Sequence, residues 1–316
     1  MSNQPLMPKF NEQKKYEEPF QLDMGFNEAL QRFSRVNTKD LLTATDEVIQ
    51  GKATPFLKWV GGKRGIIEEL KSRMPDKYGD YYEAFVGGGA LFFELLPKKA
   101  HISDANLDLI LTYKVIQNDV EKLITVLKKH QKHHCEEYYY RIRAKHNLDD
   151  PIDIAARMIY LNKTCFNGLY RVNKKGEFNT PMGKYTNPGI CQEDNLRACS
   201  KALKGTSIEY KDYTKIEPKS GDFVYFDPPY HPTSETSFTA YSMLDFTEKD
   251  QQNLADFCKE LHKQGVKIML SNSNTPFIRN LYSGKMFKTA IVNAPRLVNC
   301  KPNGRNAVEE VLITNY

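Results

Sequence analysis

Short apolar runs alternate with longer segments of helical hydrophobic spacing from residue 81 onward. The run 81–86 ends in three glycines and precedes a predicted helix over 90–96. A second run, 101–104, precedes a predicted helix over 107–117. A strand, a glycine turn, a helix and a second strand, in this order, indicate the start of an α/β unit with a parallel sheet.

The same alternation returns after residue 200, where a run of four apolar residues and a long amphipathic segment are the clearest signals. Thr247 is expected to cap the helix that this segment predicts. The predicted strands and the one helix of this half cover residues 208–210, 223–226, 248–264, 267–271 and 308–314.

The segment between these two halves has a different pattern. Residues 120–163 are helical in spacing and highly charged. Residues 166–181 instead alternate polar, aromatic and glycine residues, and 173–176 has the composition of a turn. We therefore expect helices followed by a hairpin or an ordered loop, which we call the insert hairpin (166–181).

The domain organisation follows from these patterns. We expect one α/β domain, made of residues 51–119 and 201–316, that is interrupted by an inserted, mostly helical subdomain over 120–200. Residues 1–50 are interpreted as a polar extension with a short helix over 26–33, and we assign them no role.

Composition is that of an ordinary globular protein, with 40% hydrophobic and 27% charged residues in 316. No apolar stretch is long enough for a membrane span, and the first 20 residues lack a signal-peptide core. We expect a cytoplasmic protein without a membrane partner. The net charge of +6 belongs to the body of the chain, since residues 1–50 are slightly acidic, and it hints at a polyanionic partner.

The six cysteines are scattered and form no C-x-x-C pair, so neither disulfides nor a zinc site are expected. The one dense group of possible ligands is His133-His134-Cys135. We interpret it as a polar helix end, because its spacing does not suit a metal site. No metal is expected.

The first candidate chemical motif is the glycine loop, Phe85-Val86-Gly87-Gly88-Gly89. Glycines after a strand allow a tight turn and a close approach of a ligand, although glycine is common in loops of every kind. Asp104 follows at the end of the next predicted strand, where a carboxylate can hold the ribose of a nucleoside. This geometry suits NAD and S-adenosyl-L-methionine equally, and Asp104 alone could also cap the next helix.

The second motif decides between these cofactors. Asp227-Pro228-Pro229-Tyr230, the acidic turn, follows a predicted buried strand, and its prolines stiffen the turn at the carboxyl edge of the sheet. An exocyclic amine has two N–H donors, which the Asp227 carboxylate and the Pro228 carbonyl can accept. Tyr230 can stack on the ring that carries the amine.

A third element is Phe56 to Arg64, FLKWVGGKR. An aromatic residue beside a Gly-Gly turn and a lysine could close over a ligand that has a carboxylate and an adenine. As a pattern it is weak, because Trp59, the only tryptophan, would otherwise be assigned to the core.

These residues, in this order, resemble Dam-type DNA adenine-N6 methyltransferases of the α group, especially the Gram-positive enzymes that act on GATC. The resemblance runs from about Pro55 to Tyr316. It rests on LKWVGGKR, AFVGGGALFFEL, FNGLYRVNKKGEFNTPMGKY, GDFVYFDPPY, SETSFTAYS and MLSNSN. It implies an α/β fold with a Rossmann-like methyltransferase sheet and an inserted, mostly helical target-recognition subdomain.

The resemblance also implies S-adenosyl-L-methionine as cofactor and a set of site residues. Catalysis would fall to Asp227, Pro228 and Tyr230. Contacts to the cofactor would come from the aligned positions Trp59, Lys63, Phe85, Gly87, Gly89, Asp104, Asp212, Tyr213 and Asp227, of which Asp212 and Tyr213 match less firmly.

Double-stranded DNA is the implied partner. Phe166 matches an aromatic that wedges between base pairs, and Lys58 matches a lysine that touches the outer guanine. Lys184 stands where some relatives have arginine, so that a bidentate phosphate contact is not implied. The remaining implied DNA contacts are Asn167, Leu169, Arg171 and Pro181, which read bases or lie beside them.

The expected reaction is transfer of a methyl group to N6 of adenine within GATC, after the base has flipped out of the duplex. A restriction endonuclease could act in the same system without forming a stable complex. Three alternatives stay open: a methyltransferase for RNA adenine N6 or DNA cytosine N4, a non-catalytic DNA-binding protein on the same scaffold, and an NAD-dependent Rossmann enzyme.

Overall fold

A computed structural model of the chain describes residues 52–173, 175–233, 246–294 and 308–316. Residues 51–316 form one compact unit, which is described below. The expected helix over 26–33 and residues 234–242 of the SETSFTAYS stretch lie outside the described residues.

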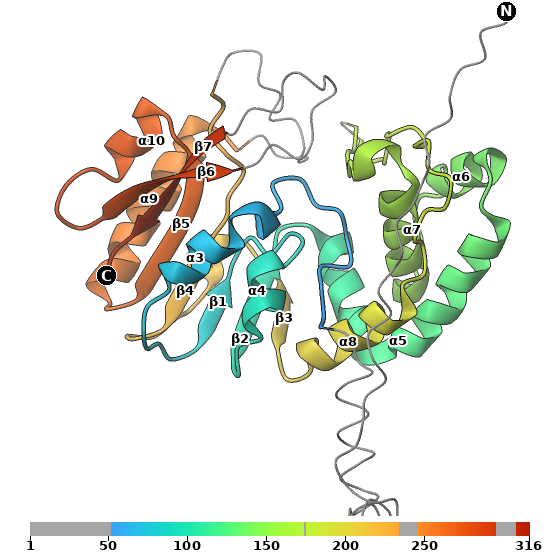
Figure 1. Cartoon of the computed structure of the whole chain (residues 1–316), viewed down its shortest axis with the longest axis horizontal. Coiled ribbons are helices and arrows are strands. Elements are labelled where there is room, and N and C mark those ends of the chain that lie inside the picture. Colours follow the sequence, from blue (N-terminus) through green and yellow to red (C-terminus); the bar gives the residue numbers. More distant parts are fainter. Residues whose placement is uncertain (1–51, 174, 234–245, 295–307) are drawn as a thin grey trace, which may run out of the picture. The chain divides into compact units, whose positions relative to one another are not determined.

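In this unit the chain forms a seven-stranded mixed sheet in the order β3-β2-β1-β4-β5-β7-β6 (Figure 1). The first five strands in this order run parallel, whereas β7 is antiparallel to both β5 and β6. The strands are β1 (Tyr81–Glu83), β2 (Ala100–Asp104), β3 (Ser207–Tyr210), β4 (Phe223–Phe226), β5 (Lys267–Ser273), β6 (Lys288–Ala294) and β7 (Val308–Thr314).

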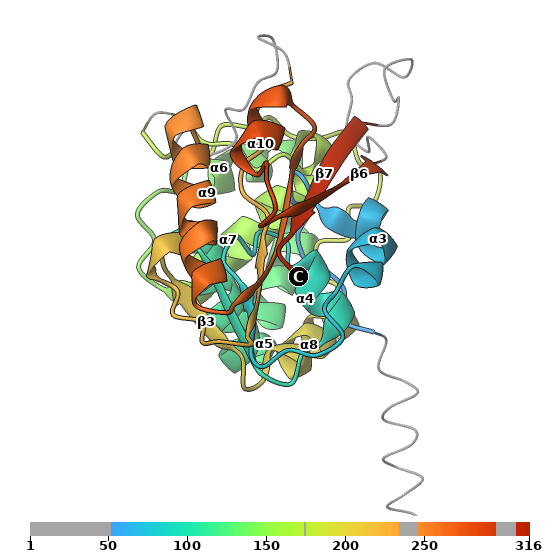
Figure 2. The same ribbon diagram turned by 90° about the vertical axis from the view of Figure 1, so that its left-hand side faces the viewer.

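Helices cover both faces of the sheet (Figure 2). One core contains α3 (Ile67–Ser72), α4 (Ala90–Leu95) and α5 (Leu107–His133) with side chains of β1, β2, β4 and β5. The other core contains α9 (Glu248–Lys263) and α10 (Pro276–Leu281) with the alternate side chains of β1, β4, β5 and β7. Strand β4 lies between the two cores, and its four residues, FVYF, are all buried. The predicted α/β class is confirmed.

Beyond the β3 edge, helices of the predicted insert gather on one side of the sheet (Figure 1). Helix α5 packs on α7 (Pro151–Thr164) and α8 (Glu193–Leu203), and α6 (Glu136–Arg143) packs on α7. Asp119 interrupts α5 with a non-helical backbone at the predicted boundary of the insert. Helices α5 and α8 nevertheless cross the predicted limits 120 and 200, so continuous helices join the insert to the sheet.

Local signals explain most element ends. Thr247 and Asp250 form a capping box at the start of α9, as predicted for Thr247. Helix α5 ends at His133 and Cys135 caps α6, which confirms the polar helix end. In the insert hairpin Gly176 N–H donates to the Asn173 carbonyl at 2.9 Å, and Val172 pairs with Phe178 across the turn. The hairpin prediction is confirmed.

The structure differs from the predicted elements in several places, and helices α3 and α10 have no predicted counterpart. Strand β1 ends at Glu83, not at residue 86, because the chain turns out of the sheet into the glycine loop. Helix α5 continues past residue 117 to His133. Helix α8 and strand β6 were not predicted, since α8 directly follows an irregular segment and five of the seven β6 residues are at least partly exposed. No helix among the described residues is both long and apolar enough to cross a bilayer.

Candidate active site

The glycine loop and the acidic turn follow neighbouring parallel strands, β1 and β4, in which Glu83 pairs with Tyr225. Both segments therefore emerge at the same carboxyl edge of the sheet, where open α/β folds bind ligands. The short 3₁₀ helix η1 (Lys63–Ile66) brings a third component, Lys63, to this edge.

Lys63 joins the acidic turn through two contacts. Its side chain is only 5% exposed, and Nζ lies 2.8 Å from Asp227 Oδ1. The same ammonium lies 4.7 Å from the centroid of the Tyr230 ring, within cation–π range. The Tyr230 hydroxyl donates to Glu310 Oε2 at 2.7 Å. The structure thus brings together three of the predicted residues, Lys63, Asp227 and Tyr230.

Two opposing effects act on the pKa of the Asp227 carboxyl. Burial raises the pKa of its carboxyl to about 6, and the positive charge of Lys63 opposes this rise. Oδ1 is buried without a hydrogen bond of good geometry, although Lys63 lies close to it. No donor among the described residues pairs with the Pro228 carbonyl. Two acceptors at this turn are therefore available to a ligand that donates hydrogen bonds.

Two buried amides brace the backbone of the acidic turn. Gln251 of α9 donates from Nε2 to the Pro229 carbonyl at 2.8 Å, and Asn272 of β5 accepts the His231 N–H at 3.0 Å. Asn272 Nδ2 also donates to Gln251 Oε1 at 2.9 Å. Both side chains are almost fully buried. The prolines and these bonds together fix the direction of the turn.

The glycine loop has the backbone geometry that only glycine adopts freely. Gly87 has φ 46° and Gly89 has φ 66°. A Cβ on Gly87 would lie 2.7 Å from Trp59 Cδ1, so the indole packs directly on the loop. Asp104 accepts the Gly87 N–H at 3.0 Å and the Asn106 N–H at 2.9 Å. Asn106, not Asp104, caps α5.

An aromatic cluster lies beside this loop. Phe85 stacks on Tyr213, which is 8% exposed, with ring centroids 5.3 Å apart. Phe246 contacts both rings. Asp212 is exposed, and its carboxylate accepts the Thr214 N–H at 2.9 Å. Phe85 and Tyr213 are thus brought together. The Asp212 side chain instead bonds to Thr214 in the 3₁₀ turn that follows it.

Sequence patterns missed Glu83, a carboxyl in the central strand that is 3% exposed. It accepts a hydrogen bond from Tyr81 at 2.7 Å, and burial raises the pKa of Glu83 to about 8, with a further contribution from Asp227. A polar residue inside a predicted buried strand was the available signal. Gln251 and Asn272 were also missed, although Asn272 lies in the MLSNSN stretch.

The predicted DNA residues lie on the insert hairpin and around it. Phe166 is 46% exposed and Asn167 has a left-handed backbone with φ 55°. Arg171 donates from Nε to Asn179 Oδ1 at 2.7 Å, which holds its guanidinium across the hairpin. Lys58 Nζ lies 4.3 Å from the Tyr185 ring centroid. The remaining predicted residues are partly or fully exposed: Leu169, Pro181 and Lys184.

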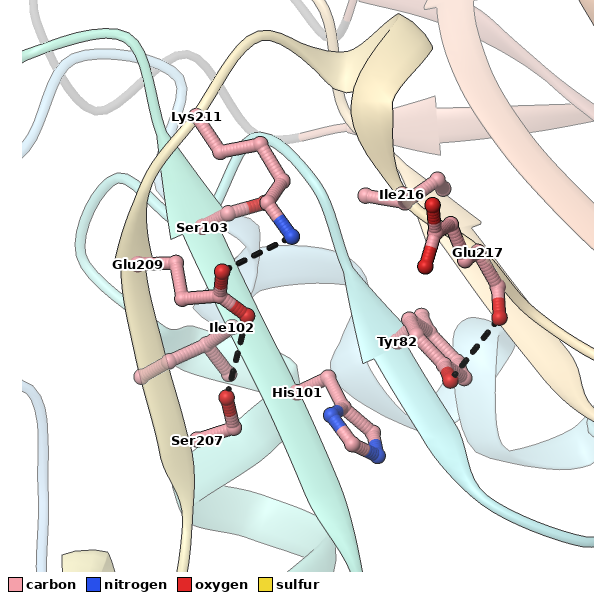
Figure 3. A pocket seen from close by; sticks show the side chains of 9 residues that line it. All are labelled: Tyr82, His101, Ile102, Ser103, Ser207, Glu209, Lys211, Ile216 and Glu217. Carbon is pink, nitrogen blue, oxygen red and sulfur yellow. Dashed lines mark hydrogen bonds and ion pairs between the residues drawn. The ribbon is translucent and has the colours of Figure 1, made fainter.

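A separate hollow of about 270 Å³ lies over β2 and β3 (Figure 3). Glu209 bonds to Lys211 at 2.8 Å in its wall, and Tyr82 and His101 stack beside it. It contains none of the predicted site residues. Among the described residues, no group of three His, Cys, Asp or Glu is placed to hold a metal ion.

Comparison with known proteins agrees with this arrangement. Residues 59–297 match the family of D12 class N6 adenine-specific DNA methyltransferases. The chain is 44% identical to the type II methyltransferase M.MjaIII of Methanocaldococcus jannaschii over 83% of this chain and 99% of that protein. It is 43% identical to the type II methyltransferase M1.LlaDCHI of Lactococcus lactis subsp. cremoris, over 83% and 95%.

The chain is also similar to proteins named DNA adenine methylase. The DNA adenine methylase of Escherichia coli K12 is 31% identical over 83% of this chain and 95% of that protein. The family match covers both the glycine loop and the acidic turn, and the seven-stranded mixed sheet agrees with a methyltransferase-like fold. The chain belongs to the D12 class of N6 adenine-specific DNA methyltransferases.

Proposed function

We propose that this adenine-specific DNA methyltransferase takes its methyl group from S-adenosyl-L-methionine and acts on adenine within GATC in duplex DNA, after flipping the base out. The observation that carries the proposal is the Lys63–Asp227–Tyr230 arrangement at the carboxyl edge of the sheet. The GATC target is supported by the insert hairpin, whose residues resemble those of GATC enzymes.

The residues at this edge fit such a cofactor. The Asp227 carboxylate, whose acceptor capacity the single contact with Lys63 does not use up, offers an acceptor, and the positive-φ glycine loop allows a close backbone approach. Trp59, Lys63 and Asp104 border this loop or the acidic turn, and Phe85 with Tyr213 provides an aromatic wall for an adenine ring. S-adenosyl-L-methionine, when bound, would supply an electrophilic methyl group. The new carbon–nitrogen bond would form as the methyl–sulfur bond breaks, S-adenosyl-L-homocysteine would leave, and one N6 proton would pass to solvent.

The chain's own groups would prepare the amine for this reaction. The Asp227 carboxylate and the Pro228 carbonyl accept the two N–H groups of adenine N6, which frees the lone pair for attack. The Asp227 charge also stabilises the positive charge that develops on the nitrogen. Tyr230 stacks on the flipped base, and its hydroxyl bond to Glu310 fixes the ring. Much of the acceleration would come from positioning.

The insert, 120–200, would read the target. Phe166 would wedge into the stack that the flipped base leaves. Arg171 would donate to guanine O6 and N7, and Leu169 or Pro181 would pack on a thymine methyl. Asn167, Lys58 and Lys184 would add contacts to flanking bases or phosphates, which makes affinity salt-dependent.

The biological setting is part of the same proposal. Two relatives are named type II methyltransferases, which supports a modification role beside a restriction endonuclease in the cytoplasm. Residues 1–50 would form an extension outside the catalytic domain, which comprises 51–119 and 201–316.

The test is methyl transfer from labelled S-adenosyl-L-methionine to short duplexes, followed by analysis of the modified nucleoside. We expect N6-methyladenine in a GATC duplex and little label in duplexes with one changed base pair or in RNA of the same sequence. Label on cytosine N4, equal label in RNA, or no transfer from this donor would contradict the proposal.

A further inference from the structure

Asn162 of α7 is fully buried and makes three hydrogen bonds to the backbone of other segments. Its Oδ1 accepts the Lys58 N–H at 2.8 Å, and its Nδ2 donates to the Lys58 carbonyl at 2.8 Å. Nδ2 also donates to the Gly168 carbonyl at 3.0 Å. One amide therefore ties the segment before Trp59 to the start of the insert hairpin.

The two tied segments also touch directly. Gly168 has φ 65°, and a Cβ there would lie 2.7 Å from Lys58 Cβ and 2.5 Å from Lys58 Cδ. Gly168 itself is buried, between the exposed Phe166 and the partly exposed Leu169. A shift of Lys58 toward Gly168 would therefore press on the segment of the hairpin that carries these two side chains.

The same unit reaches the glycine loop through Trp59, the residue after Lys58. Its indole packs on Gly87, where an added Cβ would lie 2.7 Å from Cδ1, and its Cβ lies 3.1 Å from the position of a Cβ on Gly88. Trp59 also stacks on Tyr170 of the insert hairpin, with ring centroids 5.7 Å apart and planes at 23°. A continuous set of contacts thus runs from the glycine loop to the hairpin.

We propose that Asn162 is a positioning residue that couples methyl-donor binding at the glycine loop to reading of the target bases by the insert hairpin. This inference rests on the proposed function of these two segments. A donor that orders Trp59 against the glycine loop orders Lys58 and, through Asn162, the hairpin. By thermodynamic reciprocity, target DNA on the hairpin then tightens donor binding by the same factor.

An amide is the side chain that this position requires. Both N–H groups of Nδ2 are used by carbonyls, and Oδ1 accepts a backbone N–H, so the site needs donors and an acceptor on one short side chain. Aspartate has the same shape but cannot donate in its charged form, which leaves two carbonyls without their partner. Asn162→Asp therefore removes the two donated bonds, keeps an acceptor for the Lys58 N–H, and changes the side-chain volume little.

The chain offers a matched control in Asn195 of α8. Its Oδ1 accepts the Thr54 N–H at 2.9 Å and its Nδ2 donates to the Thr54 carbonyl at 3.0 Å. These two bonds repeat the Asn162–Lys58 pair on the same N-terminal segment, and Asn195 also accepts the Thr54 hydroxyl at 3.0 Å. Among the described residues, no hydrogen bond of the Asn195 side chain reaches the insert hairpin. Asn195→Asp loosens residue 54 and leaves the connection between Lys58 and Gly168 intact.

The experiment measures the affinity of the full-length protein for S-adenosyl-L-homocysteine, an unreactive product, with and without a saturating GATC duplex. The ratio of the two dissociation constants is the coupling factor, for which allosteric proteins typically show roughly 5- to 150-fold. We expect a factor in this range for wild type and for Asn195→Asp. Asn162→Asp should lower it severalfold while both ligands still bind singly, because only the Trp59–Tyr170 stack and the Lys58–Gly168 contact then connect the two segments.

Gly168→Ala tests the same connection from the other side, because a methyl group there must displace Lys58. If thermal unfolding shows that Asn162→Asp is not folded, the coupling factor of Gly168→Ala decides the test. A wild-type factor retained in the folded variants, or lost equally in Asn195→Asp, would overturn the inference, as would a wild-type factor of one. Failure of wild type to bind either ligand would instead overturn the proposed function.

Discussion

The acidic turn and the insert hairpin both lie outside the regular elements, but the structure holds them in different ways. Buried side chains of α9 and β5 form hydrogen bonds with the backbone of the acidic turn, and its carboxylate lies beside a buried lysine. The insert hairpin is held by its own backbone bonds, by Asn162, and by Tyr139 of α6, whose hydroxyl donates to the Thr180 carbonyl at 2.9 Å. It presents Phe166 to solvent.

This difference follows from what each region is proposed to do. A group that acts on a reacting nitrogen gains from being placed before the substrate arrives, which requires burial and bracing. A group that reads base edges must be accessible to a duplex, and its energy comes from contacts that form only on binding. Substitutions in the two regions should therefore affect different measured quantities.

The largest effect is expected for Asp227→Asn. The amide keeps the shape of the side chain but loses the charge and half of its acceptor capacity, so kcat should fall by about 100-fold or more. The dissociation constant for a GATC duplex should change little. Asp256→Asn, which alters an exposed carboxylate of α9, should leave both quantities unchanged. Turnover of the Asp227 variant near the wild-type rate would contradict the catalytic role.

Arg171→Ala should change the preference for the target sequence. Loss of a bidentate contact to guanine costs about 1–3 kcal/mol of discrimination, so the ratio of kcat/KM for GATC and for a duplex changed at that guanine should drop roughly 5- to 150-fold. Lys184→Ala should instead weaken binding to all duplexes equally and lower the salt slope by about one. An unchanged ratio in the Arg171 variant would remove this residue from the reading set.

Gln251→Leu tests the brace beneath the acidic turn. The leucine cannot donate to the Pro229 carbonyl, so the turn should lose its fixed direction and kcat should fall by about tenfold, since small misplacements of reacting groups are costly. KM for DNA should stay near its wild-type value. Gln252→Leu on the same helix should have no such effect, because Gln252 bonds to Asp256 and to no other side chain that the structure describes. Equal losses in the two variants would mean that the loss reflects general damage to α9.

The pH dependence of kcat/KM for DNA should report the buried carboxylate of the acidic turn in the protein without DNA. Its pKa of about 6 means that Asp227 loses its charge as pH falls through 6, so kcat/KM should decline there. Lys63→Met removes the charge that favours the ionised form, and the acidic limb should move to higher pH. The profile is measured with DNA well below its KM. A limb that stays in place would show that another group controls it.

Glu83 should make the free energy of unfolding decrease as pH rises, whereas a carboxylate in a surface ion pair makes it increase. Its folded pKa of about 8 lies above the ordinary value of 4.5, so its contribution is full below pH 4.5 and is lost as pH rises through 8. Glu83→Gln should therefore gain stability relative to wild type between these values, measured by urea unfolding. Glu94→Gln, which removes a carboxyl with a lowered pKa, should not show this gain.

Sequence patterns predicted the elements whose burial is strongest. The four buried residues of β4 and the capped helix α9 were predicted nearly to the residue. The edge strand β6 was not, because most of its side chains face solvent and its hydrophobic signal is weak. The sequence predicted one helix over 107–117 and a separate helical segment from residue 120. The structure instead has a single helix, α5, with a kink at Asp119, and hydrophobic spacing does not distinguish the two arrangements.

The candidate site shows the same division. The resemblance to Dam-type enzymes brought Lys63, Asp227 and Tyr230 into one predicted set, because each belongs to a short contiguous stretch that the resemblance rests on. The supporting residues were missed, since Gln251, Asn272 and Asn162 act through contacts between distant segments. Such contacts leave no periodicity in the sequence, and the sequence alone does not distinguish a buried Asn or Gln from an exposed one.

The most direct test is to sequence modified bases in DNA from cells that lack their own adenine methylation and express this chain. The account predicts N6-methyladenine at GATC sites with the wild-type protein and its absence with Asp227→Asn at equal protein levels. Methylated adenine that persists at those sites in the Asp227→Asn cells would contradict the central role of the acidic turn.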